Sequence, residues 1–372
     1  MIKHTSLLIS ILLIYLFLSA CNKQTDLGKK GPNTNQIDHL PTKLKSISSP
    51  LEIGILFWSE TILGQVAMKN GLERELKNIN VVRASLEYPL IQARTFVAGD
   101  GPQGTKNQYL QMQKLLKDPP DLIILQPTDT VSLTNLVKQA NKLKVPVISY
   151  DQYIQDAEQL SFITSNNYQA GFLNGEYIDS HFEDHYEIKL ILVEYPQVSS
   201  TVSRVNGLIQ ALEFGKQKYK ILKSYSAVDP KSGSIAAHQI LKDFPQKNSI
   251  DVIFTINDGG GLPVVDAFVK AKRNEVFFAT IDGDPKSVEN IKAGYTKIDS
   301  AQFCSELGVE AMRTAYRYLS GEKVPLEISL PVFPITKETI HRYKGWEGKI
   351  PKAFVKPWKK TKNPHWTPKI NQ

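Results

Sequence analysis

Short, nearly continuous apolar runs alternate with longer stretches of helical periodicity along most of the chain, and this alternation restricts the possible folds more than any other feature. The runs are expected to be strands, at 51–58, 80–88, 121–126, 145–151, 160–166, 188–195, 219–226, 251–258, 276–282 and 295–302. The stretches between them are expected to be helices, at 65–78, 105–117, 131–143, 168–181, 201–216, 232–243, 261–272, 285–293 and 304–320. Such strands predict parallel sheets covered by helices on both faces. Their number exceeds what one sheet comfortably holds, which favours an α/β fold of two doubly wound Rossmann-like lobes.

Side chains suited to ligand contact follow several of these runs, at the points where the strands would end. They are Trp58, Ser59, Glu60, Gln126, Asp151, Gln152, Asn257, Asp258 and Asp282. In open parallel sheets, ligands bind beyond the carboxyl ends of the strands. Capping of the next helix explains any single Asp, Asn or Ser equally well, and Asp258 is expected to be such a cap. As a set, these residues predict a ligand cleft.

Three glycines, Gly259 to Gly261, follow Asn257 and Asp258 in the stretch "FTINDGGG". Glycine is a poor helix former, so the first turn of the next helix is expected to be loose. A loose turn would leave room for a bulky or unusual ligand.

The N-terminus has the pattern of an export signal, expected to cover residues 1–20. Lys3 precedes an apolar stretch at 7–18, and the small residues Ser19 and Ala20 precede Cys21. This end resembles the lipobox of bacterial lipoproteins, which implies lipidation of Cys21 and a membrane-anchored protein facing the periplasm or the cell exterior. An ordinary signal peptide with an incidental cysteine is the alternative. Polar residues at 21–50 are expected to be a flexible tether.

The formal net charge of +8 is concentrated in the last residues of the chain. Residues 341–372 hold nine Lys and Arg against the single acid Glu347, so the rest is balanced and a nucleic-acid-binding body is not indicated. Trp346, Trp358 and Trp366 are interleaved with these lysines. Such a tail can contact an anionic membrane or a partner, or dock on the protein's own surface, and contact with a membrane or partner is favoured.

Catalytic and metal-binding patterns are weak. "GDGPQG" at 99–104 has the G-x-G-x-x-G spacing, but 89–98 is a poor strand and a surface loop is expected. His181 and His185 are four residues apart, which fits a solvated helix end better than a metal site. The G-x-S-x-G, H-E-x-x-H and paired C-x-x-C motifs are absent from the sequence. No enzyme, metal or cofactor is therefore expected.

Several motifs occur in an order that resembles one known family. They are "DLIILQPTD" (121–129), "VPVISYDQ" (145–152), "SNNYQAGFLNGEYI" (165–178), "SRVNGLIQAL" (203–212), "VIFTINDGG" (252–260), "FFATIDGDP" (277–285) and "KIDSAQ" (297–302). From about 51 to 335 the chain resembles the periplasmic sugar-binding proteins of the ribose/galactose type. Members of that family are substrate-binding components of ABC importers.

The resemblance implies two lobes that close over a ligand about a three-strand hinge near 163–166, 300–303 and 325–328. The first lobe would comprise residues 51–163 and 303–326, and the second lobe would comprise residues 164–302 and 327–340. Residues 341–372 would form the tail.

By the same resemblance, hydroxyl groups of the ligand would be held by Asp151, Arg204, Asn257 and Asp282. Gln126, Gln152 and Gln302 would complete the network, and Trp58 would stack on the ligand with Ser59 and Glu60 beside it. Gly64, Gln65 and Val228 stand where relatives commonly carry aromatic rings. The implied function is delivery of a small polar solute, a sugar or modified sugar, to an ABC permease. The alternative is a sensor of the same fold that signals to a membrane histidine kinase.

Overall fold

The computed structural model describes residues 47–370, all of which belong to one compact unit. The predicted signal, Cys21 and most of the predicted tether lie outside these residues. Within 47–370, no helix is long and apolar enough to cross a membrane.

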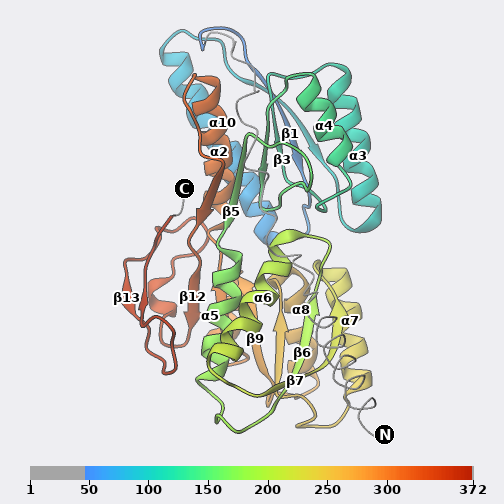
Figure 1. Ribbon diagram of the computed structural model, residues 1–372, viewed down its shortest axis with the longest axis vertical. Coiled ribbons are helices and arrows are strands. Elements are labelled where there is room, and N and C mark those ends of the chain that lie inside the picture. Colours follow the sequence, from blue (N-terminus) through green and yellow to red (C-terminus); the bar gives the residue numbers. More distant parts are fainter. Residues whose placement is uncertain (1–46, 371–372) are drawn as a thin grey trace, which may run out of the picture. The chain divides into compact units, whose positions relative to one another are not determined.

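The first lobe is built on a six-stranded parallel sheet in the order β11-β5-β4-β3-β1-β2 (Figure 1). Its strands are β1 (Glu52–Phe57), β2 (Gln92–Val97), β3 (Leu122–Leu125), β4 (Val147–Tyr150), β5 (Ser161–Ser165) and β11 (Glu327–Leu330). Helices α2 (Leu63–Ser85) and α10 (Cys304–Leu319) cover one face, and α3 (Gly101–Lys117) and α4 (Thr134–Lys142) cover the other. The central strands bury both faces, which is why they have continuous apolar runs.

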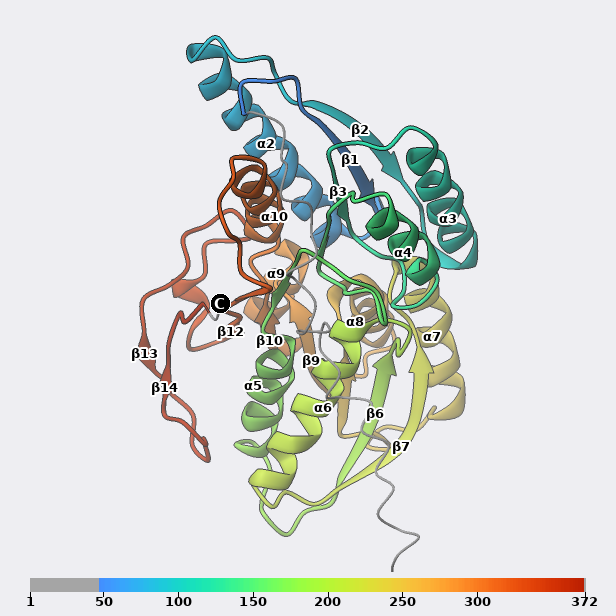
Figure 2. The same cartoon turned by 45° about the horizontal axis from the view of Figure 1, so that its top comes forward.

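The second lobe repeats this design, with the sheet order β12-β10-β9-β8-β6-β7 (Figure 2). Its strands are β6 (Ile188–Glu194), β7 (Tyr219–Ser226), β8 (Val252–Thr255), β9 (Phe277–Asp282), β10 (Thr296–Ala301) and β12 (Phe333–Thr336), with only β12 antiparallel to its neighbour. Helices α5 (Asn167–Asp179) and α6 (Ser199–Phe214) pack on one face and α7 (Pro230–Asp243) and α8 (Asp258–Lys270) on the other, while α9 (Pro285–Ala293) lies beside β10. The prediction of two doubly wound lobes is confirmed.

Three passages connect the two sheets, between β5 and α5, between β10 and α10, and between β11 and β12. The third lies a few residues later than expected. β11 pairs with β5, so residues 327–330 belong to the first sheet and not to the second lobe, where the sequence analysis placed them.

The strand expected at 80–88 is wrong, because α2 continues through it to Ser85. Val81 and Val82 suggested a strand, but both side chains are exposed on the helix. The buried side chain is Arg83, which donates hydrogen bonds to the carbonyl oxygens of Ile47, Ser49 and Pro89. These contacts with distant backbone outweigh the weak strand preference of the valines.

The second strand of the first lobe is instead β2, an edge strand with no fully buried residue, which is why it lacks an apolar run. "GDGPQG" follows it directly, and α3 begins at Gly101, so the motif lies at a strand-to-helix turn and not in the isolated surface loop that was expected. Gly104 allows that turn to be tight, since a Cβ there would lie 1.9 Å from the carbonyl oxygen of Gly99.

The C-terminal segment packs on the second lobe. After the 3-10 helix η2 (Ile340–Arg342), β13 (Phe354–Val355) and β14 (His365–Trp366) form a small antiparallel pair. Tyr343, Phe354 and Trp366 join the apolar cluster of the second lobe, and the Trp366 indole N–H donates to the Val332 carbonyl oxygen at 2.8 Å. The alternative of docking on the protein's own surface is therefore confirmed, while contact with a membrane or partner stays a prediction. The segment docks on the protein's own surface.

Candidate functional site

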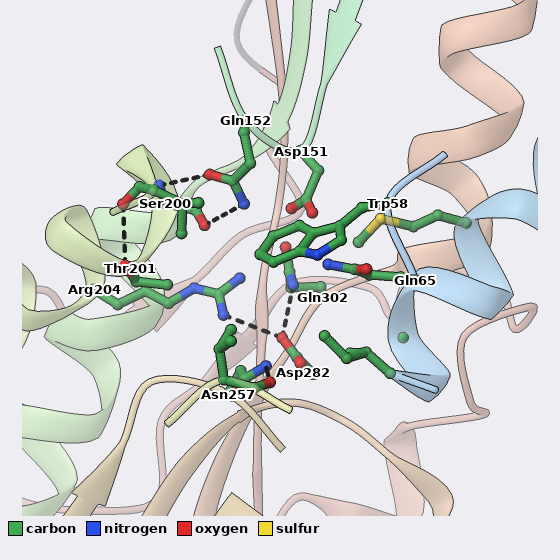
Figure 3. A pocket seen from close by; sticks show the side chains of 15 residues that line it. Trp58, Gln65, Asp151, Gln152, Ser200, Thr201, Arg204, Asn257, Asp282 and Gln302 are labelled. Atoms are coloured by element: carbon green, nitrogen blue, oxygen red, sulfur yellow. Dashed lines mark hydrogen bonds and ion pairs between the residues drawn. The ribbon is translucent and has the colours of Figure 1, made fainter. Parts of the chain in front are cut away.

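A pocket lies between the two lobes, at the carboxyl ends of their strands (Figure 3). It is lined by Trp58, Ile62, Gly64, Gln65, Met68, Asp151, Gln152, Val198, Ser200, Thr201, Arg204, Val228, Asn257, Asp282 and Gln302. The cavity left among these side chains is only about 20 Å³, close to the size of one water molecule, so the side chains nearly fill the pocket.

Arg204, in the second turn of α6, organises the second-lobe wall of the pocket. Its Nη1 donates to the Asp282 carboxylate at 3.2 Å and to the Ile256 carbonyl oxygen at 2.7 Å, and its Nε donates to Asn167 Oδ1 at 2.9 Å. Gln302, from the β10–α10 passage, donates from Nε2 to the same Asp282 oxygen at 2.7 Å. The guanidinium and the carboxylate are thereby held in fixed orientations.

The charged groups of the pocket are almost fully removed from water. Burial raises the pKa of Asp282 to about 6, and the nearby Arg204 opposes this shift only in part. Burial also raises the pKa of Asp151, against the opposing effects of Arg204 and of the hydrogen bond from Gln126. In such a low-dielectric site, hydrogen bonds to these groups are strong and unpaired polar groups are costly.

Both carboxylates project from backbone in an unusual conformation. Asp151 follows β4 with φ of 66°, and Asp282 ends β9 with φ of 133°. Positive φ is uncommon for residues other than glycine and is often retained at functional sites, where the surrounding structure enforces it. The strained backbone sets the direction in which each carboxylate enters the pocket.

Gln152 joins the two lobes across the pocket. Its Nε2 donates to Ser200 Oγ at 2.7 Å, and its Oε1 accepts from the Ser200 backbone N–H at 3.1 Å. Ser200 lies in the first turn of α6, whose N-cap residue Val198 offers no side-chain cap. An amide from the first lobe therefore satisfies a free N–H of a second-lobe helix, which indicates a closed arrangement of the lobes.

Two buried amide oxygens of the pocket have no hydrogen-bond partner among the described residues. They are Gln65 Oε1, from the first turn of α2, and Gln302 Oε1. An unsatisfied buried acceptor costs free energy, so both oxygens are positioned to accept hydrogen bonds from a ligand.

Gln126 supports the pocket without lining it. Its Oε1 accepts from the Trp58 backbone N–H at 3.1 Å, and its Nε2 lies 3.3 Å from Asp151 Oδ2. It thus orients the Trp58 segment, whose buried ring borders the pocket. The structure does not bring Ser59 and Glu60 to the lining. Ser59 Oγ accepts from the backbone N–H groups of residues 61 and 62, and the Glu60 side chain is exposed.

Asn257 takes both the pocket role expected for it and the capping role expected for Asp258. Asn257 lines the pocket, but it is also the N-cap of α8, since its Oδ1 accepts from the Gly260 N–H and its Nδ2 donates to the Val228 carbonyl oxygen. Asp258 is instead buried behind the pocket and accepts from Thr280 Oγ1 and from the Asp284 N–H. The expected cap at Asp258 is wrong, because the helix begins one residue earlier than that assignment requires.

The glycine triplet forms an ordinary helical turn. The Gly261 N–H donates to the Asn257 carbonyl oxygen at 3.0 Å, so the expected loose turn and the extra ligand room are not present. A Cβ at Gly259 would lie 2.7 Å from the Val228 carbonyl oxygen, and one at Gly261 would lie 2.3 Å from Thr255 Oγ1. The glycines allow α8 to pack closely against the loop after β7 and against β8.

Sequence reasoning missed five lining residues and noted three others only for their lack of a ring, Gly64, Gln65 and Val228. The missed residues are Ile62, Met68, Val198, Ser200 and Thr201. Ser200 and Thr201 follow β6 at the turn into α6, so the rule for carboxyl ends of strands applies to them as well. Met68 lies one turn into α2, with no polar signal to mark it. Within 47–370, no group of three or more His, Cys, Asp or Glu is arranged to hold a metal.

Comparison with known proteins adds a family match. The sequence model of the family described as "Periplasmic binding protein domain" matches residues 53–323. The ribose import binding protein of Escherichia coli K12 is 25% identical over 272 residues, covering 72% of this chain and 86% of that protein. The protein of the same name from Bacillus subtilis 168 is 22% identical over 268 residues, covering 72% of this chain and 81% of that protein.

Solved structures share the fold. A Caulobacter myo-inositol-binding protein bound to myo-inositol superposes with a TM-score of 0.67 at 21% identity, covering 80% of this chain and 97% of that one. A galactofuranose-binding protein gives a TM-score of 0.68 at 16% identity, covering 78% of this chain and 96% of that one. The family match ends at residue 323, so β12 and the C-terminal segment lie beyond it.

Proposed function

Because the chain belongs to the periplasmic binding protein family, we propose that it binds a small sugar or sugar-like solute between its lobes and delivers it to an ABC importer. The observation that carries this proposal is the set of buried groups around one small space. They are two carboxylates, one guanidinium and two unpaired amide oxygens.

The chemistry of these groups suits a polyhydroxylated ring. A hydroxyl is both donor and acceptor, so Asp151 and Asp282 accept a hydrogen bond from its O–H while Arg204 donates one to its oxygen. Gln65 Oε1 and Gln302 Oε1 accept from further hydroxyls, and the Trp58 ring offers an apolar surface to the C–H face of a sugar. A ligand that lacks these hydroxyls would leave buried groups unpaired, which provides discrimination.

Relatives support the same ligand class. The curated relatives are named as ribose import binding proteins, and structures of the same fold hold myo-inositol and D-allose. Each of these ligands is small and carries several hydroxyl groups. The proposal also includes anchoring to a membrane by lipid on Cys21, which rests on the small residues that precede this cysteine.

The test is a thermal-shift screen of the purified full chain against D-ribose, myo-inositol and D-allose. A ligand at 100 times its dissociation constant stabilises the folded protein by about 2.7 kcal/mol, which is a measurable rise in Tm. We expect at least one of these probes to raise the Tm of the wild type and to have no effect on Arg204→Gln.

Arg273→Gln is the matched control. Arg273 is also a buried second-lobe arginine, but it bonds to the Phe244 carbonyl oxygen and to Glu275, away from the pocket. This variant should lose stability and keep the ligand response. A wild type that responds to no polyol or sugar, or an Arg204→Gln variant that responds fully, would refute the proposal.

A further inference from the structure

The chain beyond η2 returns to the ligand pocket, through residues 343–347, which we call the clasp segment. The Trp346 indole N–H donates to the Asp282 carbonyl oxygen at 2.7 Å, and the Tyr343 hydroxyl donates to the Gly283 carbonyl oxygen at 3.1 Å. The two acceptor residues, Asp282 and Gly283, are consecutive and have φ of 133° and 80°. They form the turn that aims the Asp282 carboxylate into the pocket. The clasp segment therefore holds the strained backbone of a pocket residue from outside the pocket.

The same segment is anchored firmly in the second lobe. The Tyr343 ring is buried and stacks on Phe333, with ring centroids 6.0 Å apart and an interplanar angle of 11°. Phe333 belongs to β12, which pairs with β10. Tyr343 thus moves as part of the second lobe.

Three residues later, the segment packs on the first lobe. The Trp346 ring joins the apolar cluster that contains Met68 and Leu72 of α2 and Leu307 of α10. A Cβ on Gly64, in the first turn of α2, would lie 3.9 Å from Trp346 Cζ2 and 3.7 Å from Asp282 Oδ2. The indole therefore covers the glycine at the point where α2 faces the Asp282 carboxylate.

An ion pair adds a second link to the first lobe. Glu347 Oε1 lies 2.9 Å from Arg74 Nη1 of α2, and Arg74 Nη2 donates to Ser305 Oγ at the start of α10. Both charged side chains are well exposed, so this pair contributes little free energy by itself. The apolar contacts of the partly buried Trp346 ring are the stronger link.

We propose that the clasp segment holds the two lobes together and that Trp346 is a positioning residue for Asp282. Opening of the cleft separates the lobes, so it must break the contacts of Trp346 with one lobe or the other. The clasp thus shifts the ligand-free protein toward the closed state and slows release of a bound solute. This inference goes beyond the proposed function because it applies to the protein without ligand.

The experiment measures hydrogen exchange of the full chain without ligand, comparing the wild type with Trp346→Phe. This change keeps an aromatic ring and removes the N–H that bonds to Asp282. Loss of one such bond should speed exchange by about two- to tenfold in the first turns of α2 and at residues 283–284. Trp346→Ala should produce a larger increase.

Trp366→Phe is the matched control, because it loses the same kind of bond, to the Val332 carbonyl oxygen, within the second lobe. It should lower Tm comparably and leave exchange in α2 unchanged. If Trp346→Phe leaves exchange in α2 at the wild-type rate, or Trp366→Phe accelerates it equally, the clasp is overturned.

A second measurement uses any probe sugar that raises the Tm of the wild type. Its dissociation rate should rise in Trp346→Phe and stay unchanged in Trp366→Phe, and equal rates in all three proteins would contradict the positioning role. If no probe binds, the proposed function fails on that screen, while the exchange data still decide the clasp.

Discussion

Replacing Asp282 with Asn should make the ligand-free protein more stable at neutral pH. Burial raises the pKa of Asp282 to about 6 in the folded protein, whereas an Asp in an unfolded chain has a pKa of about 3.9. Below about pH 4 the carboxyl is neutral in both states, and its contribution to stability is fully present. As the pH rises, the unfolded chain ionises first, so this contribution is lost progressively until the pH exceeds about 6.

The size of this loss of stability follows from the shift in the pKa of Asp282. Two pKa units correspond to about 3 kcal/mol, at about 1.4 kcal/mol per unit. Asn is neutral at every pH, and Arg204 keeps its bonds to Asn167 and to the Ile256 carbonyl oxygen. The pKa of about 6 already includes the attraction between Arg204 and the carboxylate, so we expect a net gain of at most about 3 kcal/mol at pH 7.5 and no gain at pH 4.

Urea unfolding followed by circular dichroism at pH 4, 5, 6 and 7.5 measures this difference. The wild type should lose stability relative to the variant between pH 4 and pH 6. Asp266→Asn, at an exposed position of α8, is the control and should follow the wild type at every pH. The reasoning is refuted if Asp282→Asn is less stable than the wild type at pH 7.5, or if the difference does not depend on pH. A gain in stability together with loss of sugar binding would mark Asp282 as retained for function.

Two further predictions concern the ends of the chain. Lys356→Met should destabilise the protein by about 3–5 kcal/mol in urea unfolding, because it leaves the buried Glu176 carboxylate without a cation. Adding Glu176→Gln should restore most of the lost stability. Lys352→Met at an exposed position is its control, and a loss no larger than that control's would contradict the prediction. Cells grown with a radiolabelled fatty acid should label the wild type and not Cys21→Ser, and equal labelling of both would exclude a lipid on Cys21.

The two-lobe fold could be predicted from the sequence because buried parallel strands keep a continuous apolar run, as β1, β3 and β8 do. The same signal failed at the edge of the first sheet. β2 has a half-exposed pattern and no apolar run, while Val81 and Val82 of α2 imitate one on an exposed helix face. Edge strands and long helices with exposed valines are cases where local pattern and tertiary environment differ.

The candidate site was predictable in outline for a similar reason. Asp151, Gln152, Asn257 and Asp282 follow buried strands, and the carboxyl ends of parallel strands meet at one edge. The exact roles were not predictable, since Asn257 and Asp258 are both good helix caps and a shift of one residue decides which one caps. Gln302 was expected from the family resemblance, whereas Gln65 gained its importance only from the three-dimensional structure, which shows an unpaired oxygen on each.

The C-terminal segment shows most clearly where composition stops being informative. Lysines and tryptophans suit an anionic membrane, but they suit an acidic, aromatic protein surface equally well. The place where the segment docks is determined by α5, a helix that is buried on nearly every side. This helix places Glu176 in the interior, where a carboxylate needs a cation. Lys356 supplies that cation, and the backbone N–H of Lys362 donates to the other carboxylate oxygen at 2.7 Å. A chain truncated at residue 340 would therefore lose both Trp346 and the cation that pairs with Glu176. Any change in its ligand affinity would reflect damage to the cleft.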